Sequence, residues 1–420
     1  MARRRCRVSG ECQQNRMLNF LLIFLVSSVV VAALFKINRA ILLASWLLGF
    51  LLPIDYVDGF APIIFDVCRY ALLLVLALRL ETSFQGRRYA AVIVCYLLIS
   101  YNLLLYIVQA VQGGGFVTSR ALVGIGSVFL AFAATRNGSH NRILLLGFVT
   151  GCTISAMDIL AQVAGLPYLG TPTDWGARYA GLSFNSTNTA PFLAVAALVV
   201  LSRRIWSQTV TARLFRLISF LILLGGLVLT GGRGGLAGFL VGASAYLLFL
   251  IRRSPGIGLT GLLLVISVTI SQYSAIVDFL TREGGTGGFT TGRDVLNAQA
   301  WDAFWQGGIF GVSVTERDLY RPHTPLLTFA LDVGPWGLLV AIASTVALFY
   351  RLIRPARPTS EGEVASMMAG VLVTTALLEP VGFFVGAAKA VVLMIVLRAA
   401  IGGFQIMHHK PGVVCARGGL

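Results

Sequence analysis

Two arginines and one histidine have neighbours suited to binding and activating an anionic substrate. Arg233 stands among four glycines in the sequence Thr-Gly-Gly-Arg-Gly-Gly at 230–235, and Arg293 follows a Thr-Gly pair. A guanidinium can bind two phosphate oxygens at once, and glycines let the backbone approach a ligand closely. His323 lies in the sequence Arg-Pro-His-Thr-Pro at 321–325, and a histidine can take or give a proton near neutral pH. These residue types predict an anion-binding site beside a proton-transfer group.

Each of these residues also has a purely structural interpretation. Arg233 could reach lipid headgroups from a tight turn between two helices, and Arg293 could face solvent while Asp294 stabilises a helix start. A lone histidine at a membrane interface is more often structural than catalytic. The other histidines, His140, His408 and His409, lie in segments predicted to be cytosolic. His323 is predicted to share one face with both arginines, which favours a single shared site.

Charged residues inside apolar segments supply further candidates, because such groups in membrane proteins are usually functional. Asp66 and Arg69 are three residues apart on one predicted helix face and could form a pair. These two, with Asp158, Asp332 and Lys389, lie roughly 5–8 residues from the outer helix ends, or about 8–12 Å deep, which predicts a polar cavity that opens outward. The residues predicted to bind substrate are Arg178, Arg321, Asp332, Arg69 and Asp66.

The sequence contains no signature of a cofactor or metal site. A P-loop, a dinucleotide-binding fingerprint, a nucleophile elbow and a cluster with metal-ligand spacing are all absent. The six cysteines lie in the termini or in apolar segments, so no disulfide framework is predicted. We therefore expect no cofactor, no metal and no ATP-driven chemistry in this chain.

The elements that must position these residues are apolar. The chain has 420 residues, of which 57% are hydrophobic and 12% are charged, and its mean hydropathy is +0.83. These values are typical of polytopic membrane proteins. The apolar runs lack the period-two alternation of a barrel, and helices of about 17–25 residues can cross a bilayer. The predicted fold class is therefore all-α, a polytopic transmembrane helical bundle.

Thirteen segments are candidate spans: 17–35, 40–54, 61–80, 89–109, 119–135, 143–165, 188–201, 214–230, 235–251, 257–272, 326–350, 363–378 and 383–403. Counting back from a cytosolic C-terminus places the N-terminus outside, whereas its arginines favour the inside. One of the first two segments could therefore be re-entrant or shared, which gives about 12 or 13 crossings. The predicted divisions are a basic cytosolic N-terminus (1–16), membrane bundles (17–272 and 326–403), a periplasmic loop (273–325) and a cytosolic tail (404–420).

The loop 273–325 is the longest predicted outer segment. It shares its face with 166–187, with the turn 231–234 and with Glu379-Pro380. Within it, Arg293 to Gln306 is predicted to be a helix with a broad apolar side that carries Trp and Phe. Such a composition suits a helix at the membrane interface.

The basic residues are distributed unequally between the two predicted sides of the membrane. The net charge is +16 and the pI is about 10.2, yet most of the arginines fall in connectors predicted to be cytosolic. This distribution follows the positive-inside rule of membrane proteins. The charge therefore predicts contact with a lipid bilayer and no nucleic-acid partner.

The order of these elements resembles that of the O-antigen ligase and O-antigen polymerase superfamily of membrane glycosyltransferases. The resemblance covers most of the membrane region and is best from about Gly181 to Leu339. The residues that carry it are Gly232-Arg233-Gly234; Thr291-Gly292-Arg293 followed by Trp301, Phe304 and 307–311; and His323 followed by Leu326, Leu327 and 334–337. The family commonly has Asn after this histidine, where the chain has Thr324.

The resemblance implies a glycan donor carried on undecaprenyl diphosphate and a metal-independent transfer to an acceptor hydroxyl at the periplasmic face of the bacterial inner membrane. Arg233 and Arg293 would hold the diphosphate, and His323 would orient or deprotonate the acceptor, with Asp332 as its partner. The acceptor is a growing glycan in a polymerase or lipid A-core in a ligase of lipopolysaccharide. Of the two, we expect polymerisation of a surface polysaccharide or exopolysaccharide, with other polysaccharide assembly proteins as partners.

Two other classes of function stay open. A transporter or flippase of lipid-linked sugars predicts ionisable residues at the midplane and alternating access, whereas the buried charges are predicted in the outer half. A structural partner of a polysaccharide export complex predicts that Arg233, Arg293 and His323 are all dispensable.

Overall fold

A computed structural model describes most of the chain. The described residues are 2–35, 37–58, 60–79, 89–111, 115–135, 138–170, 178–183, 185–202, 206, 209–256, 258–261, 263, 267, 293–312, 324–353, 360–378 and 387–399. Within these residues the regular structure is helical throughout. The chain is therefore an all-α helical bundle, as its apolar runs predict.

The helices are, in chain order, α1 (Ala2–Leu34), α2 (Asn38–Leu51), α3 (Pro62–Arg79), α4 (Tyr89–Val111), α5 (Gly115–Ala134), α6 (Gly138–Val163), α7 (Ser186–Leu201), α8 (Val210–Leu229), α9 (Arg233–Arg253), α12 (Arg293–Gln306), η1 (Gly308–Phe310), α14 (Pro325–Ile353), α15 (Ser360–Leu378) and α16 (Ala387–Ala399). The predicted interfacial helix at 293–306 is confirmed as a helix with the same bounds. Most of the predicted span 257–272 lies outside the described residues. Helix α1 contains most of the basic N-terminal segment 1–16 as well as the first apolar run.

Four helical stretches of the described residues are long and apolar enough to cross a membrane: His140–Val163, Val210–Leu229, Arg233–Ile251 and Leu326–Tyr350. Several other apolar helices are shorter. Two of these, α2 with 14 residues and α7 with 16, rise only about 21 and 24 Å at ~1.5 Å per residue. A hydrocarbon core is about 30 Å thick, so neither helix alone matches its full thickness.

Both short helices end on an arginine from a neighbouring helix. Arg69 of α3 donates through Nε to the carbonyl oxygen of Leu51 at 2.9 Å, at the end of α2. Arg216 of α8 donates to the carbonyl oxygens of Val200 at 3.0 Å and Leu201 at 2.9 Å, at the end of α7. The last carbonyls of a helix have no partner within it. These guanidiniums supply the missing donors and allow the two helices to end inside the bundle.

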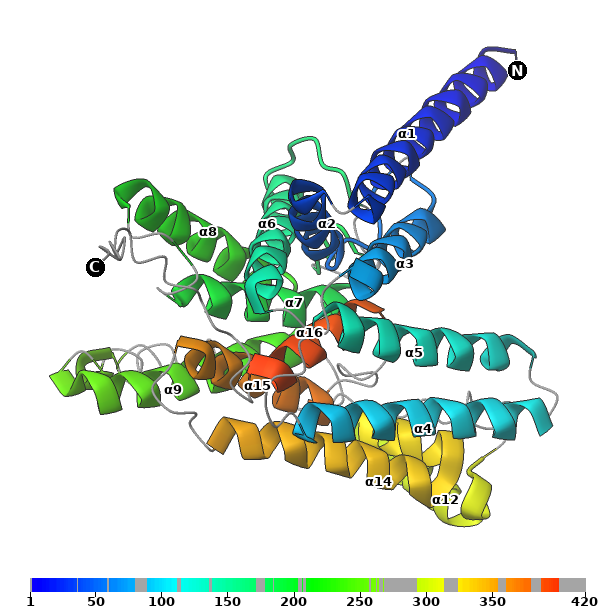
Figure 1. Ribbon diagram of the computed structural model, residues 1–420, viewed down its shortest axis with the longest axis vertical. Helices are drawn as coiled ribbons and strands as arrows, with labels where there is room; N and C mark the ends of the chain where they lie inside the picture. The colour runs from blue at the N-terminus through cyan, green and yellow to red at the C-terminus, as the bar shows by residue number, and fades with distance from the viewer. Residues whose placement is uncertain are drawn as a thin grey trace, which may run out of the picture.

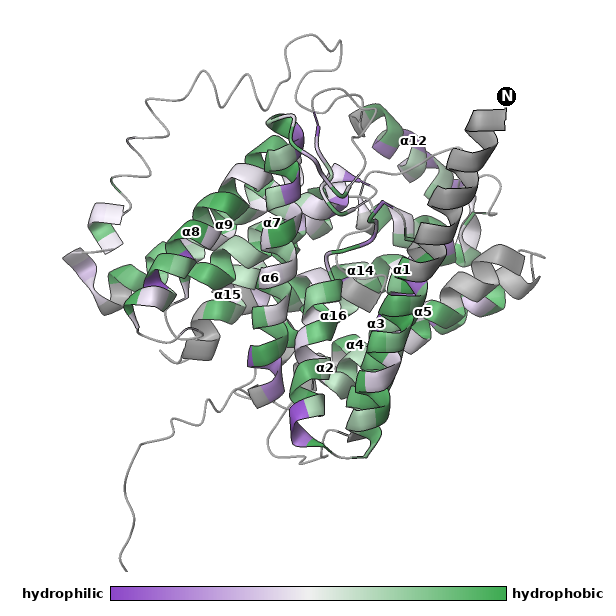
Figure 2. Ribbon diagram, turned by 90° about the horizontal axis from the view of Figure 1, so that it is seen from above, coloured by the Kyte–Doolittle hydropathy of each residue, from purple (hydrophilic) through white to green (hydrophobic). Residues whose placement is uncertain are grey.

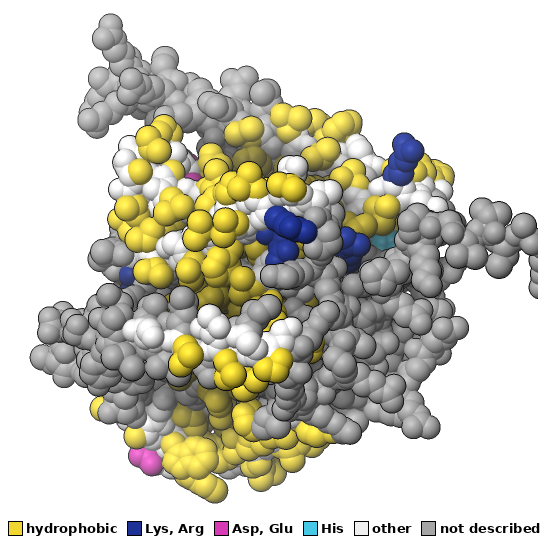
Figure 3. Space-filling view, turned by 90° about the vertical axis from the view of Figure 1, so that its left-hand side faces the viewer, with side chains coloured by type: hydrophobic (Ala, Val, Ile, Leu, Met, Phe, Trp, Pro, Cys, Tyr) yellow, Lys and Arg dark blue, Asp and Glu magenta, His cyan; other side chains and the backbone are white. Residues whose placement is uncertain are grey.

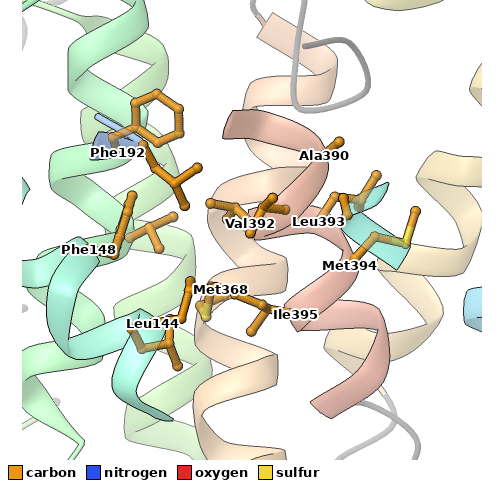
Figure 4. Packing of buried hydrophobic residues seen from close by; sticks show 14 of the residues in the cluster. Leu144, Phe148, Phe192, Met368, Ala390, Val392, Leu393, Met394 and Ile395 are labelled. Carbon is orange, nitrogen blue, oxygen red and sulfur yellow. The ribbon is translucent and has the colours of Figure 1, made fainter. Parts of the chain in front are cut away.

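The centre of the molecule is built on α7 and α16. Residues 189–200 of α7 are all buried, and residues 390–395 of α16 are almost fully enclosed. Figure 4 shows Phe192 and Phe148 on one side of Val392, with Met368 of α15 below, between Leu144 and Ile395. Because both helices are apolar all round, they require the other helices to cover every face. Figure 1 shows the other helices arranged around α7, α15 and α16.

The outer face of the bundle is apolar rather than charged. On α8 a stripe of exposed residues recurs at helical spacing: Val210, Leu214, Leu217, Leu221 and Val228. Figure 3 shows hydrophobic side chains over much of the described surface on one side, interrupted by few charges. Figure 2 shows the same apolar character along α3, α6, α8 and α9. A continuous exposed apolar surface of this kind fits contact with lipid.

Three glycines allow α2 and α6 to pack backbone against backbone. A Cβ atom at Gly147 of α6 would collide with the carbonyl oxygen of Trp46, and one at Gly49 of α2 with that of Leu144. Gly151 has a similar contact with the carbonyl oxygen of Phe50. Small residues at helix contacts are a common means of close association in membranes. Here they fix the position of the short helix α2.

We expect Gly147→Ala to destabilise the protein by at least about 1–3 kcal/mol, because the added methyl group overpacks a backbone contact. Gly126→Ala in α5 is the matched control, since nothing lies within 4 Å of its added Cβ. That control should be neutral or slightly stabilising, because alanine favours a helix over glycine. The measurement is thermal unfolding of the purified protein in detergent. Equal melting temperatures for the two variants would contradict the close α2–α6 contact.

Candidate functional site

The site is built around the first turn of α7. Asn185 precedes the helix in an extended conformation, and its side-chain oxygen accepts a hydrogen bond from the backbone N–H of Thr187 at 2.9 Å. Such a cap fixes where a helix begins. The Thr189 hydroxyl then donates to the carbonyl oxygen of Ala180 at 2.7 Å. This bond holds the segment 178–183 against the start of α7.

The glycine turn at 230–235 packs against the same part of α7. Gly231 has φ +59°, a left-handed conformation that glycine adopts readily. A Cβ atom on Gly232 would collide with the side chain of Ala190, and one on Gly235 would lie 2.5 Å from it. Glycine is thus required for the turn to reach α7. Arg233, between these two glycines, begins α9 next to the first turn of α7.

Arg178 belongs to the same neighbourhood. The backbone N–H of the next residue, Tyr179, donates to the carbonyl oxygen of Leu229 at 3.4 Å, at the end of α8. The segment 178–183 therefore lies between the end of α8 and the start of α7. The side chains of Arg178 and Arg233 are both partly exposed. The structure thus brings two of the predicted site arginines to one end of the bundle.

Lys389 contributes a further positive charge. Its Nζ donates to the side-chain oxygen of Asn188 in the first turn of α7, at 3.3 Å. The span prediction starts at 383, whereas α16 begins at Ala387, so Lys389 lies in its first turn. The sequence signals Lys389 as a charge in an apolar run. It gives no indication that Lys389 belongs beside Asn188, which is 201 residues away.

Arg178, Arg233 and Lys389 form what we call the cation cluster. They come from different elements, and the described contacts tie all three elements to the start of α7. The helices α7, α9 and α16 also begin here, and a helix start carries partial positive charge. Gly232 caps α9 without a side-chain hydrogen bond. Three cationic side chains and three helix starts therefore lie on elements that meet at the start of α7.

The predicted pair of Asp66 and Arg69 is confirmed. Arg69 Nη1 donates to Asp66 Oδ1 at 2.8 Å, and Nη2 donates to Asp55 Oδ1 at 2.8 Å and to the carbonyl oxygen of Ile54. With the Leu51 contact, this buried guanidinium binds four oxygens. Its geometry fits a structural tie between α2 and α3. Substrate binding by Arg69 and Asp66 stays a prediction.

Asp55 connects this tie to the cation cluster. The Ser183 hydroxyl donates to Asp55 Oδ2 at 3.3 Å, and the backbone N–H of Asp55 donates to the carbonyl oxygen of Leu182 at 2.9 Å. The same segment carries Arg178. Asp55 follows the end of α2, and no pattern in the sequence marks it as a site residue. The hydrogen bonds make Arg69 and Asp55 a support for the segment 178–183.

Asp158 supports the preceding loop. Its carboxylate accepts the backbone N–H groups of Leu169 at 2.5 Å and Gly170 at 3.2 Å, and the side chain of Gln162 at 2.7 Å. A Cβ on Gly170 would collide with the carbonyl oxygen of Gly181. The buried Asp158 thus anchors 166–170 on α6, and Gly170 in turn packs against the segment 178–183.

Asp332 lies in a second part of the structure, in α14. Its Oδ2 accepts a hydrogen bond from the Tyr101 hydroxyl of α4 at 2.6 Å. The Tyr101 ring also stacks on Phe329, with ring centroids 4.2 Å apart. Asp332 is buried. The described contacts place it between α4 and α14 and do not join it to the cation cluster.

Helix α12 packs on the first half of α14. Ala300, Ala303 and Phe304 face Leu327 and its neighbours in a small apolar cluster, and Figure 1 shows the two helices side by side. The predicted broad apolar side is only partly buried. Phe304 is buried, whereas Trp305 is 68% exposed. Other exposed apolar residues nearby are Val295, Trp301, Ile309 and Phe310. Their aromatic exposure matches a helix at a membrane interface.

The other residues predicted for the site, Arg293, Arg321 and His323, lie at or beyond the ends of the described segments. The backbone of Arg293 begins α12, but its side chain lies outside the described residues, as do Arg321 and His323. The described chain resumes at Thr324, directly after His323. Among the residues that the structure describes, no group of three or more His, Cys, Asp or Glu side chains could hold a metal ion.

A comparison with protein-family models finds none that matches the chain, and a search of curated proteins finds no match either.

Proposed function

We propose that this chain is an integral-membrane glycosyltransferase that transfers a glycan from a polyprenyl diphosphate, such as undecaprenyl diphosphate, to an acceptor hydroxyl. The observation that supports it best is the cation cluster at one end of an apolar helical bundle. A lipid-linked diphosphate carries its charge directly beside an apolar tail. A protein that binds it needs concentrated positive charge next to a lipid-facing surface, and Arg178, Arg233 and Lys389 supply that charge.

In the proposed reaction the acceptor oxygen bonds to the anomeric carbon of the donor sugar. The bond between that carbon and the diphosphate oxygen breaks, and the polyprenyl diphosphate leaves with the electron pair. His323 takes the hydroxyl proton. Arg233 and Arg293 stabilise the charge that develops on the leaving group, an electrostatic role. Arg178 and Lys389 hold the same diphosphate.

The proposed setting is the inner membrane of a bacterium, with about 12 or 13 crossings and the loop 273–325 on the periplasmic side. The cation cluster then opens to the periplasm, where lipid-linked glycans are transferred. Helix α12 would lie at the interface with Trp301 and Trp305 towards the lipid headgroups. The polyprenyl tail would reach the site between helices.

Within this class, polymerase and ligase differ in the acceptor. We propose polymerisation of a surface polysaccharide or exopolysaccharide, because a growing repeat-unit chain is the more general acceptor. A ligase would deliver a finished chain to lipid A-core. In a strain that lacks the protein, loss of polymer with single repeats still attached indicates a polymerase, whereas polymer left on the lipid carrier indicates a ligase.

The test is reconstitution of the purified protein in liposomes with lipid-linked glycan extracted from its source strain. We expect release of polyprenyl diphosphate and formation of a longer or newly attached glycan, with the activity kept in EDTA. Movement of the donor between leaflets without release of the diphosphate would instead identify a transporter and overturn the proposal.

Variants of the cation cluster make the test specific. We expect Arg178→Met and Lys389→Met each to raise the KM for the donor by about tenfold or more, because each removes a charged hydrogen bond to phosphate. Arg213→Met removes an exposed charge from α8 and is the matched control. An unchanged KM in both cluster variants, with the control also unchanged, would contradict diphosphate binding at this place.

A further inference from the structure

Helix α14 is interrupted directly after Asp332. Val333 has φ −143° and ψ 27°, and Gly334 has φ 65° and ψ −147°, neither of which is helical. Pro335 follows, and proline has no backbone N–H. The carbonyl oxygen of Leu331, four residues before Pro335, therefore has no donor within the helix. A buried carbonyl without a donor is costly, so another part of the chain must supply one.

That donor comes from the segment after α12. The backbone N–H of Val312 donates to the carbonyl oxygen of Leu331 at 2.8 Å, and Val312 is buried in the same small cluster as Leu327. The chain that follows η1 thus completes the hydrogen bonding that Pro335 leaves open.

Two glycines make this contact possible. A Cβ on Gly334 would lie 2.5 Å from the carbonyl oxygen of Ile309. One on Gly311 would collide with the carbonyl oxygen of Leu331 and lie 2.9 Å from the backbone nitrogen of Gly334. Both glycines have positive φ, +79° at Gly311 and +65° at Gly334. The two backbones interlock so closely that a side chain at either position would separate them.

We propose that Gly311 and Gly334 form a clasp that positions α12 and Asp332 for catalysis. The proposal rests on the proposed function. The clasp fixes the end of the helix that Arg293 begins, and Gly311 lies against the backbone of Asp332, with its Cβ position 3.1 Å from the carbonyl carbon. Tyr101 holds the Asp332 carboxylate from the other side. Gly311 and Gly334 act through α12 and Asp332, so they are positioning residues.

This arrangement separates positioning from donor binding. The cation cluster lies on α7, α9, α16 and the segment 178–183, whereas the clasp joins η1 and α14. Opening the clasp should therefore misplace Arg293 and Asp332 and leave Arg178, Arg233 and Lys389 in place to bind the donor. A displacement of about 1 Å can reduce turnover by about 100-fold. We expect Gly311→Ala to lower kcat by about 10- to 100-fold and to change the donor KM by less than about twofold.

Gly308→Ala is the matched control. Gly308 also has positive φ, +69°, but nothing lies within 4 Å of its added Cβ. Both substitutions strain a left-handed backbone, so a difference between them reports the contact with α14. Spin labels at Gln299 of α12 and Leu339 of α14, two exposed positions, give the distance between the helices by pulsed EPR in an otherwise cysteine-free protein.

The expected result is a broader Gln299–Leu339 distance distribution in Gly311→Ala, a distribution in Gly308→Ala like that of the parent, and a kcat loss confined to Gly311→Ala. Equal broadening in both variants, or no change in Gly311→Ala, overturns the clasp. A changed distance with an unchanged kcat, or a changed KM with an unchanged kcat, overturns its positioning role. The EPR comparison needs no turnover, so it tests the clasp even if transfer activity is absent and the proposed function fails.

Discussion

Replacing His323 by alanine should lower glycan transfer by at least about 100-fold, the usual minimum contribution of a positioned acid–base group. Arg293→Ala should have an effect of similar size, because an arginine at a helix start adds full charge to the partial charge of the helix where the leaving diphosphate develops its charge. The measurement is complementation of a null strain, with the glycan product and the accumulated lipid-linked donor both quantified. The donor should accumulate as the product disappears.

Two controls separate chemistry from misfolding. His408→Ala removes a histidine predicted on the cytosolic side, and Arg317→Ala removes another arginine of the same outer loop. Both variants should keep wild-type activity, and all four proteins should reach the membrane in equal amounts. Full activity of stable His323→Ala and Arg293→Ala variants would exclude the proposed mechanism and favour a structural partner of an export complex.

Replacing Arg69 by methionine should destabilise the protein by about 2–4 kcal/mol. The change removes a buried guanidinium that binds Asp55 and the carbonyl groups of Leu51 and Ile54, and the loss of one partner leaves the others without a donor. Helix α2 would lose the cap on its last turn. The segment 178–183, which Asp55 holds through Ser183, would loosen with it. Thermal unfolding in detergent measures the effect.

Asp66→Asn is the control for this prediction, because the Asp66 side chain is 60% exposed and an exposed ion pair contributes at most about 1 kcal/mol. Its melting temperature should stay close to that of the wild type. If Arg69→Met instead unfolds like the wild type and raises only the donor KM, Arg69 binds substrate, as the sequence alone predicts.

The helices themselves could be predicted from the sequence. Continuous apolar runs predict nearly all of them, and α12 has its predicted bounds because Gly292 precedes it, Gly307 and Gly308 follow it, and Asp294 favours its first turn. The pairing of Asp66 with Arg69 was equally predictable, since residues three apart face the same side of a helix. Such features depend only on residues that are close in the sequence, whose relative positions the helix geometry determines.

The contacts between distant segments could not be predicted from such local patterns. Arg69 has a second acid, Asp55, because α2 ends beside α3, and Lys389 reaches Asn188 because α16 begins beside α7. No motif or spacing in the sequence indicates either pairing. Pro335 predicts a carbonyl without a donor at Leu331, yet nothing local predicts that Val312 supplies the donor.

The sequence by itself determined that this protein is a bundle of apolar helices and which charges stand inside them, because hydropathy and helical period are properties of short segments. The tertiary structure decided which of those charges meet. It brought the elements that carry Arg178, Arg233 and Lys389 to the start of α7, gave Arg69 and Asp158 their hydrogen-bond partners, and interlocked Gly311 with Gly334. The physical reason is that packing between helices, rather than propensity within them, fixes the relative position of residues far apart in the chain.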